Sequence, residues 1–349
     1  MPRRYAPRND GDGVQKERND IIMPGFIKNI QLQKLLAFAV LVVLYIFFGI
    51  FGRNFFSVDY ALVILASAYW IGFLAIGVTF VIITGGIDLS IGTSMICTAI
   101  IGGMLFKDFG LPLWLCLIIV IIIGTIIGLL NGMLVTRLKL PPFIATLGMM
   151  MVARGFGSIA TNTVAKTYPS MHDEGGSWFS KVFLRVDTFP TGALWLLAYF
   201  VIAFIVLNKT KLGRYIFAIG SNEEAVRLSG VNVANWKCAA YAISGFSTGI
   251  GAIFYAAFAT TINPGTGNGF ELEAIAGVII GGTSLAGGVG SVTGTMIGVF
   301  IMAVLKAGLS SMNLPAPFQL FFTGLVVICA VWLDMYRVKK ASEVKKIKA

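Results

Sequence analysis

The residues best suited to chemistry gather at three places in this chain. They are a short polar run at 220–230, two glycine-rich turns at 85–92 and 281–290, and a few charges inside apolar segments. None of these places sets a nucleophile beside a general base. The single histidine, His172, stands alone in a polar loop, and the four cysteines lack metal-ligand spacing. The sequence therefore predicts no catalytic residue and no metal ligand.

The polar run predicts a short helix that is capped at both ends. Ser221 and Glu224 have the spacing of a capping box, in which each side chain binds the other residue's free backbone N–H. Glu223 joins Glu224 in the first turn, where the helix dipole favours anions, and Gly230 suits the left-handed residue that stops a helix. About two turns, or ~12 Å, would result. The candidate residues here are Gly220, Ser221, Asn222, Glu223, Glu224, Arg227, Ser229 and Gly230.

Two interpretations of this helix stay open. It lies in a loop, 209–235, that also carries several basic residues. A short helix capped at both ends is suited to docking in a groove of a partner protein. The alternative is a simple connector that lies on the lipid headgroups.

The glycine-rich turns predict two elbows between apolar segments. In the first, Gly85 and Gly86 end one helix, and Asp88 or Ser90 caps the next. Such an elbow is either a hinge or only a tight turn at the membrane edge. A faint similarity links Val81–Gly92 to Val278–Gly290, so the second elbow is a candidate repeat of the first. The candidate hinge or pathway residues are Gly85, Gly86, Asp88, Ser90, Asn131, Arg154, Gly281, Gly282, Gly287 and Gly288.

Four charges fall in or beside apolar segments. Arg154 lies in mid-segment, where a charge is costly unless it faces protein or water, so it either forms an internal pair or lines a path. Lys306 lies nearer a segment end, and we expect it to extend its ammonium to the interface. Glu271 and Glu273 begin a segment at the outer mouth. They are expected to contact a partner or a polar solute there, or to be ordinary exposed acids of a helix start.

The elements that position these residues are predicted to be membrane-spanning helices. The 349 residues are 57% hydrophobic and 12% charged, whereas soluble domains carry about 25% charged residues. Apolar segments of about 20 residues match a hydrocarbon core of ~30 Å. The 41 glycines suit helices that pack closely in lipid. The predicted spans are 33–51, 60–83, 90–106, 112–134, 142–162, 190–208, 236–260, 271–286, 292–311 and 316–334.

Charge orients the predicted bundle. The net charge is +11, and 20 of the 27 Lys and Arg residues fall at the two ends and in alternate loops. This bias places both termini in the cytoplasm, which requires an even number of spans. The same distribution favours membrane over nucleic acid as the reason for the positive charge. Ten spans fit, with the glycine-rich eighth segment either crossing, broken or re-entrant.

The fold class expected is therefore all-α, a polytopic transmembrane helical bundle of about ten helices. Residues 1–31 are polar and too acidic for a signal peptide, so they are expected to form a disordered basic cytoplasmic tail. Residues 32–336 form the transmembrane domain, with the loop 209–235 inside it. Residues 337–349 form a second basic cytoplasmic tail.

Several motifs, in order, make the chain recognisable. It resembles bacterial ABC-importer permeases for simple sugars, the ribose, galactoside and xylose group, from about residue 32 to 338. The family's usual Tyr-Glu-Leu-Asp-Ala-Ile-Ala appears here as Phe-Glu-Leu-Glu-Ala-Ile-Ala, and Lys306 stands where the family usually has Asn. The matching segments are Gly213–Tyr215 through Ser229–Val231, Gly85–Gly92, Gly128–Gly132, Pro142–Gly148, Arg154–Gly155, Phe270–Ala276, Gly281–Gly288 and Gly294–Thr295.

The resemblance implies a translocation subunit rather than an enzyme. Its partners would be an ABC ATPase, a periplasmic or lipid-anchored sugar-binding protein and a second permease subunit, all at the bacterial cytoplasmic (inner) membrane. The helix at 221–230 would couple the ATPase to the bundle. The chain has no Gly-x-x-x-x-Gly-Lys-Ser/Thr phosphate loop, so ATP and Mg²⁺ would bind the partner ATPase, with no cofactor on this chain.

Two alternatives remain at this stage. One is an importer of a branched-chain amino acid or a nucleoside from the same superfamily, although the turn motifs favour sugars. The other is an ion-driven secondary transporter or channel. Such proteins usually place acidic or histidine relays within their spans, whereas the acids here fall at predicted span ends.

Overall fold

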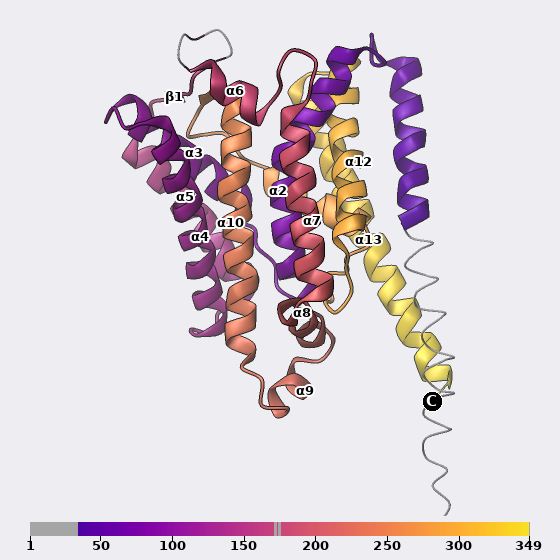
Figure 1. Ribbon diagram of the computed structural model, residues 1–349. Coiled ribbons are helices and arrows are strands. Elements are labelled where there is room, and N and C mark those ends of the chain that lie inside the picture. Colours follow the sequence, from indigo (N-terminus) through magenta and orange to yellow (C-terminus); the bar gives the residue numbers. More distant parts are fainter. Residues whose placement is uncertain (1–33, 171–172, 174–175, 349) are drawn as a thin grey trace, which may run out of the picture.

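The chain folds as an all-α polytopic bundle (Figure 1). The computed structural model describes residues 34–170, 173 and 176–348. The predicted tail 1–31 and His172 lie outside these residues. The described helices and strands are Lys34–Phe51, α2 (Val58–Ile83), α3 (Ile91–Lys107), α4 (Leu113–Thr136), α5 (Pro142–Ala160), β1 (Lys166–Thr167), α6 (Ser177–Phe183), α7 (Thr191–Lys209), α8 (Lys211–Ser221), α9 (Glu223–Leu228), α10 (Val233–Ala259), β2 (Thr261–Ile262), α11 (Phe270–Ile280), α12 (Val292–Ser311) and α13 (Ala316–Lys348).

Eight helices within the described part of the chain are long and apolar enough to cross a membrane. They are Lys34–Phe51, α2, α4, α5, α7, α10, α12 and the stretch Pro317–Tyr336 of α13. The third predicted span is α3, an apolar helix of 17 residues. The eighth is α11, with only 11 residues, or about 16 Å of helix. The chain is therefore a multi-pass membrane protein.

The eighth segment crosses the bundle as a broken element. Helix α11 ends at Ile280, and the chain continues without helix through Gly281–Ser291 until α12 begins. In Figure 1 this irregular stretch reaches the end of the bundle that carries α8. Glycine at positive φ interrupts the helix here, at Gly282, Gly287 and Gly288. Non-helical backbone is stable at membrane depth only when protein or water forms hydrogen bonds with its N–H and C=O groups.

Both described ends of the chain point toward the same end of the bundle. In Figure 1 the helices α8 and α9 and the C-terminal end of α13 lie at the lower end, and Lys34–Phe51 runs down from the top so that its start lies about half-way down the bundle. Helix α13 continues beyond the predicted boundary at residue 336, so the segment 337–348 extends the last helix. The assignment of this end to the cytoplasm rests on the positive-inside rule and stays a prediction.

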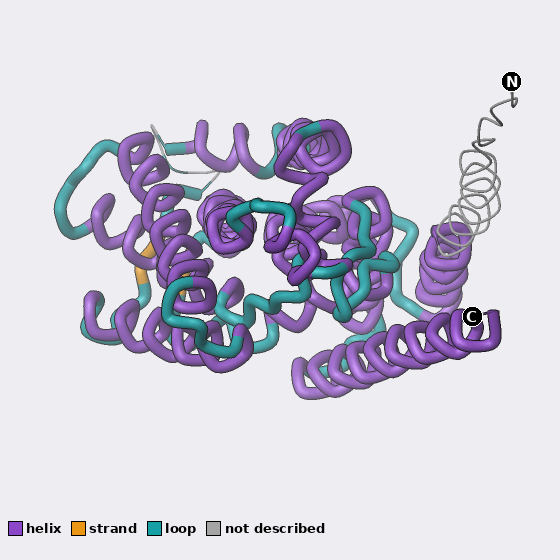
Figure 2. Tube along the Cα trace, turned by 90° about the horizontal axis from the view of Figure 1, so that it is seen from below, coloured by secondary structure: helices purple, strands orange, loops and turns teal. Residues whose placement is uncertain are grey.

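The core of the bundle is built on α2, α10 and α12, which are mostly buried. Helix α10 packs against α4 on one side and α2 on the other, and α2 in turn contacts α12. Lys34–Phe51 and α13 lie together at one edge, seen from below in Figure 2, and most of their residues are exposed. Exposed apolar side chains on these helices suit lipid or another membrane subunit.

A glycine seam joins α4 to α10. Gly124 and Gly128 on α4 face Gly245 and Gly249 on α10, with four-residue spacing on both helices. A Cβ at Gly245 would lie 2.2 Å from the Gly124 carbonyl oxygen and 2.7 Å from Gly128 Cα. Helices in lipid have no hydrophobic driving force between them and associate largely through van der Waals packing. Small residues allow the close approach that this packing needs.

Replacing Gly245 with alanine should therefore destabilise the protein. We expect the overpacked seam to cost about 1–3 kcal/mol, seen as a lower thermal unfolding temperature in detergent. Gly148 on α5 is the matched control, because nothing lies within 4 Å of its missing Cβ. There the gain in helix propensity should leave stability unchanged or raise it by up to ~1 kcal/mol. Equal stability of the two variants would contradict close packing at the seam.

Candidate functional site

Helices α8 and α9 form an arm at the end of the bundle. Asn222 is the N-cap of α9: its backbone is extended (φ −161°, ψ 94°) and its Oδ1 accepts the Ala225 N–H at 3.0 Å. Gly230 follows the helix at φ +83°, and its N–H donates to the Arg227 carbonyl at 3.1 Å. The predicted glycine stop is confirmed.

The predicted capping box of Ser221 and Glu224 is wrong. Ser221 is the last residue of α8, and its hydroxyl donates to the Phe217 carbonyl one turn back at 2.9 Å. The chain leaves α8 only at Asn222, so the following helix begins one residue later than a Ser221 cap would allow. It is also shorter than predicted, with six residues, Glu223–Leu228.

Helix α8 was not predicted. It is amphipathic and is capped by Thr210, whose side chain accepts the Gly213 N–H at 3.5 Å. Its inward residues Ile216 and Ile219 are buried. Apolar residues spaced at three to four positions were the available signal, and the glycines at 213 and 220 masked it.

The arm has polar and apolar contacts of its own. Glu223 pairs with Lys237 of α10 at 2.6 Å, and Glu224 pairs with Arg227. The hydrogen bond that Arg227 donates to Glu224, and then the negative charge of Glu224, raise the pKa of Arg227. Ile219, Val226 and Val233 form a small hydrophobic cluster separate from the main core. These contacts allow the arm to move relative to the bundle as one rigid unit.

The C-terminal end of α8 lies directly on both elbows. The Gly288 N–H donates to the Ile83 carbonyl at 2.8 Å. A Cβ at Gly220 would lie 1.8 Å from that carbonyl oxygen and 2.4 Å from Gly288 N. A Cβ at Gly287 would lie 2.9 Å from Gly85 N and 3.0 Å from the Gly220 oxygen. Three backbone segments thus meet without side chains between them, and we call this contact the glycine junction.

The two elbows have the same local geometry. Each begins where a Val-Ile-Ile helix end is followed by a left-handed glycine, Gly85 at φ +76° and Gly282 at φ +92°. The N–H of Gly85 donates to the Ile82 carbonyl and that of Gly282 to the Ile279 carbonyl, both at 2.9 Å. In each elbow the N–H of the next residue donates to the carbonyl five residues earlier, at 3.2 Å. The sequence similarity of the elbows therefore extends to their backbone bonding.

Asp88 lies inside the bundle rather than at the membrane edge. It is 1% exposed, and its carboxylate accepts the Ser90 N–H (3.1 Å) and hydroxyl (2.7 Å), the Asn131 amide (3.3 Å) and the Ser244 hydroxyl (3.0 Å). Ser244 is about 16 Å along α10 from its start. The expected side-chain cap of α3 by Asp88 or Ser90 is wrong. Ser90 is the N-cap residue, but its hydroxyl donates to Asp88, and Asp88 accepts from Ser90 rather than from the first turn of the helix.

Ser244 is a site residue that sequence reasoning missed. Asn131 and Asp88 stood in recognisable motifs, whereas Ser244 lies in an ordinary helical stretch of α10. Nothing in the sequence marks its partner, because the two residues are 156 positions apart.

Arg154 forms an internal hydrogen-bonded pair, one of the two arrangements expected for it. Its guanidinium donates to Asn268 Oδ1 in the loop before α11. It also lines a small cavity between α3, α5 and that loop. The second expectation, that Arg154 lines a path, is therefore consistent with the structure.

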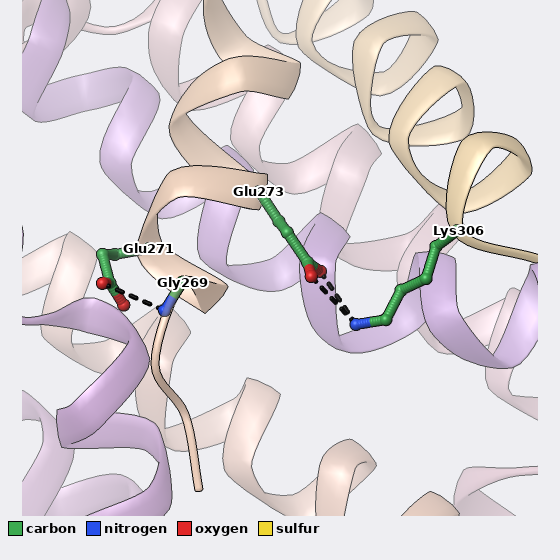
Figure 3. A network of polar contacts seen from close by, with 4 residues as sticks. All are labelled: Gly269, Glu271, Glu273 and Lys306. Atoms are coloured by element: carbon green, nitrogen blue, oxygen red, sulfur yellow. Dashed lines mark hydrogen bonds and ion pairs between the residues drawn. The ribbon is translucent and has the colours of Figure 1, made fainter. Parts of the chain in front are cut away.

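Lys306 does not extend to the interface. Its ammonium lies 2.9 Å and 3.2 Å from the two carboxylate oxygens of Glu273 (Figure 3). It also lies 5.0 Å from the ring centres of Trp70 and Phe270. The carboxylate and the aromatic faces together stabilise the charge inside the protein.

Glu271 is not an exposed acid of a helix start. It is 8% exposed and accepts the Gly269 N–H at 3.2 Å. Figure 3 shows it pointing away from the Glu273–Lys306 pair. The two acids therefore face different neighbours, although they are only two residues apart.

Within residues 34–170, 173 and 176–348, no group of three or more His, Cys, Asp or Glu side chains is arranged to hold a metal ion. The site consists instead of the arm, the glycine junction, the buried Asp88 cluster and the polar contacts before α11.

Comparison with known proteins decides the family. A family model described as "Branched-chain amino acid transport system / permease component" matches residues 60–331. The chain belongs to this family. The permease is 34% identical to the ribose import permease protein of Haemophilus influenzae over 301 residues, 86% of this chain and 92% of that protein. No solved structure matches the chain.

Two further relatives are similar over most of the permease. The ribose import permease protein of Bacillus subtilis is 36% identical over 305 residues, 87% of this chain and 93% of that protein. The galactose/methyl galactoside import permease protein of Escherichia coli K12 is 35% identical over 274 residues, 75% and 82% of the two chains. The relatives are translocation components, and the permease is likewise not an enzyme.

Proposed function

We propose that this permease is the membrane subunit of an ATP-driven importer of a monosaccharide in the bacterial inner membrane. The family description names branched-chain amino acids, but the similar proteins reported above are import permeases for ribose and galactose. Similarity over most of both chains favours a sugar over an amino acid or a nucleoside. A sugar-binding protein would deliver the substrate from the periplasm, and a second permease subunit would complete the path.

The observation that carries the coupling to a separate ATPase is the arm formed by α8 and α9. Leu228, at the end of α9, is 79% exposed at the tip of the bundle. An apolar side chain there, on a helix with fixed caps, is suited to a pocket on a partner protein. The middle of the arm, where α8 ends, contacts both elbows at the glycine junction. A displacement of the arm by the ATPase would therefore act on both elbows at once.

The buried Asp88 cluster bears on the ion-driven alternative. Asp88 is an acid within the bundle, as such a transporter would require. Its oxygens, however, accept hydrogen bonds from Asn131 of α4, Ser244 of α10 and Ser90, which suits a fixed structural group. The arm has no evident use in an ion-driven protein, so we retain the ATP-driven function.

Co-purification with an ABC ATPase co-expressed from the genome that encodes this permease tests the proposal. The wild-type pair should form a complex in detergent, and Leu228→Ala should weaken its affinity about tenfold, or ~1.4 kcal/mol. Ile159→Ala is the matched control, because Ile159 is 78% exposed but lies at the end of α5, remote from the arm. No complex with wild-type protein would contradict the proposed function, and equal affinities of the two variants would contradict docking by α9.

A further inference from the structure

Two buried polar atoms near the start of α11, one on α11 and one on α5, have no hydrogen-bond partner within the described structure. They are Glu271 Oε2 and Arg154 Nε. Burying an acceptor or a donor without a hydrogen bond costs about 1–3 kcal/mol each, so such atoms call for an explanation. One is a carboxylate acceptor and the other a guanidinium donor, and a hydroxyl group can donate to the first and accept from the second.

The fold holds these two side chains in place from three directions. Arg154 extends from α5 and is fixed by Asn268. Glu271 is fixed by the N–H of Gly269, which has φ +86° and turns the chain into α11. Gly92 of α3 makes room for the carboxylate, because a Cβ there would lie 2.4 Å from Glu271 Oε2. Both functional groups are thus positioned by contacts that leave one polar atom of each unused.

A cavity lies beside Arg154. It is lined by polar and apolar groups of α3, α5 and the loop before α11, among them Thr93, Cys97, Gly157, Pro264 and Thr266. It is small in this structure, so a solute larger than water enters only after the loop 263–269 has moved away from α3 and α5. The Arg154–Asn268 bond ties the loop to α5, and its opening would widen the cavity and free more of the guanidinium.

We propose that Arg154 and Glu271 bind hydroxyl groups of the transported sugar as it passes between α3, α5 and the loop 263–269. Neighbouring hydroxyls of a monosaccharide each donate and accept, which matches one charged donor and one charged acceptor. The Glu273–Lys306 pair lacks this capacity, because its two charges already satisfy each other. This inference rests on the proposed function and assigns a substrate contact to the permease itself.

The test is sugar transported per ATP hydrolysed, measured with the whole complex in proteoliposomes. The probes are radiolabelled D-ribose and D-galactose, each supplied at saturation with a sugar-binding protein that assembles with the complex. Glu271→Gln keeps the shape of the side chain but removes its charge. We expect the sugar-to-ATP ratio to fall at least fivefold, while ATP hydrolysis stimulated by the loaded binding protein stays within twofold. Arg154→Lys, which keeps the charge but removes Nε, should act in the same direction.

Glu273→Gln is the matched control, two residues away on the same helix. It should lower thermal stability by breaking the pair with Lys306, but leave the sugar-to-ATP ratio unchanged. An unchanged ratio in both Glu271→Gln and Arg154→Lys would overturn the inference, as would an equal fall in Glu273→Gln. Absence of transport of either sugar by the wild-type complex would instead contradict the proposed function. If Glu271→Gln does not assemble, Arg154→Lys alone decides.

Discussion

Replacing Gly220 with valine should reduce sugar uptake at least tenfold while the protein remains folded in the membrane. Gly220 has no space for a side chain, because a Cβ would lie 1.8 Å from the Ile83 oxygen. The added isopropyl group would push α8 off the glycine junction. The arm would still hold its own small cluster around Ile219 and Val226, so binding of the ATPase should persist.

In this variant, therefore, sugar uptake should fall while binding of the ATPase stays unchanged. The measurement is uptake in proteoliposomes beside co-purification of the ATPase, with size-exclusion chromatography to confirm that the protein is folded. Gly155→Val on α5 is the matched control, since nothing lies within 4 Å of its missing Cβ. Wild-type uptake by Gly220→Val would show that the contact between arm and elbows has no part in coupling.

Asp88→Ala should abolish folded protein. The change removes the acceptor of four hydrogen bonds, from Ser90 (two), Asn131 and Ser244. Each donor left buried without an acceptor costs about 1–3 kcal/mol, and the sum is comparable with a typical total stability of about 5–15 kcal/mol. Yield and thermal unfolding in detergent measure the loss.

Glu224→Ala provides the comparison for this second variant. Glu224 is an acid of the exposed arm that pairs only with Arg227 within the described structure, and an exposed pair contributes little to stability. Its removal should shift the unfolding temperature by no more than 1–2 °C. Normal yield and stability of Asp88→Ala would mean that the buried cluster is not what joins the first elbow to α4 and α10.

The spans and the ends of the elbows could be predicted because they depend on local signals. Runs of apolar residues specify helices in lipid whatever their neighbours. Gly85 and Gly230 stop helices for a reason contained in their own backbone conformation. The family could be recognised for a similar reason, since its motifs coincide with these turns.

The pairing of charges could not be predicted, because it depends on residues far apart in the chain. Lys306 was expected at the interface, and only its contact with Glu273, 33 residues away, shows why it stays inside. The prediction of the α9 cap was wrong for a local reason instead. Ser221 and Asn222 are both good N-cap residues, and the unpredicted helix α8 occupies Ser221 and leaves Asn222 as the cap.

The most direct test of the account is ATP-dependent sugar uptake by the reconstituted complex. Proteoliposomes should contain the permease and its ATPase, with ATP inside the ATPase-accessible compartment and the loaded binding protein on the opposite side. We predict uptake of radiolabelled D-ribose or D-galactose that requires hydrolysable ATP and the binding protein. Uptake driven by an ion gradient without ATP, or an assembled complex that hydrolyses ATP but moves neither sugar, would contradict it.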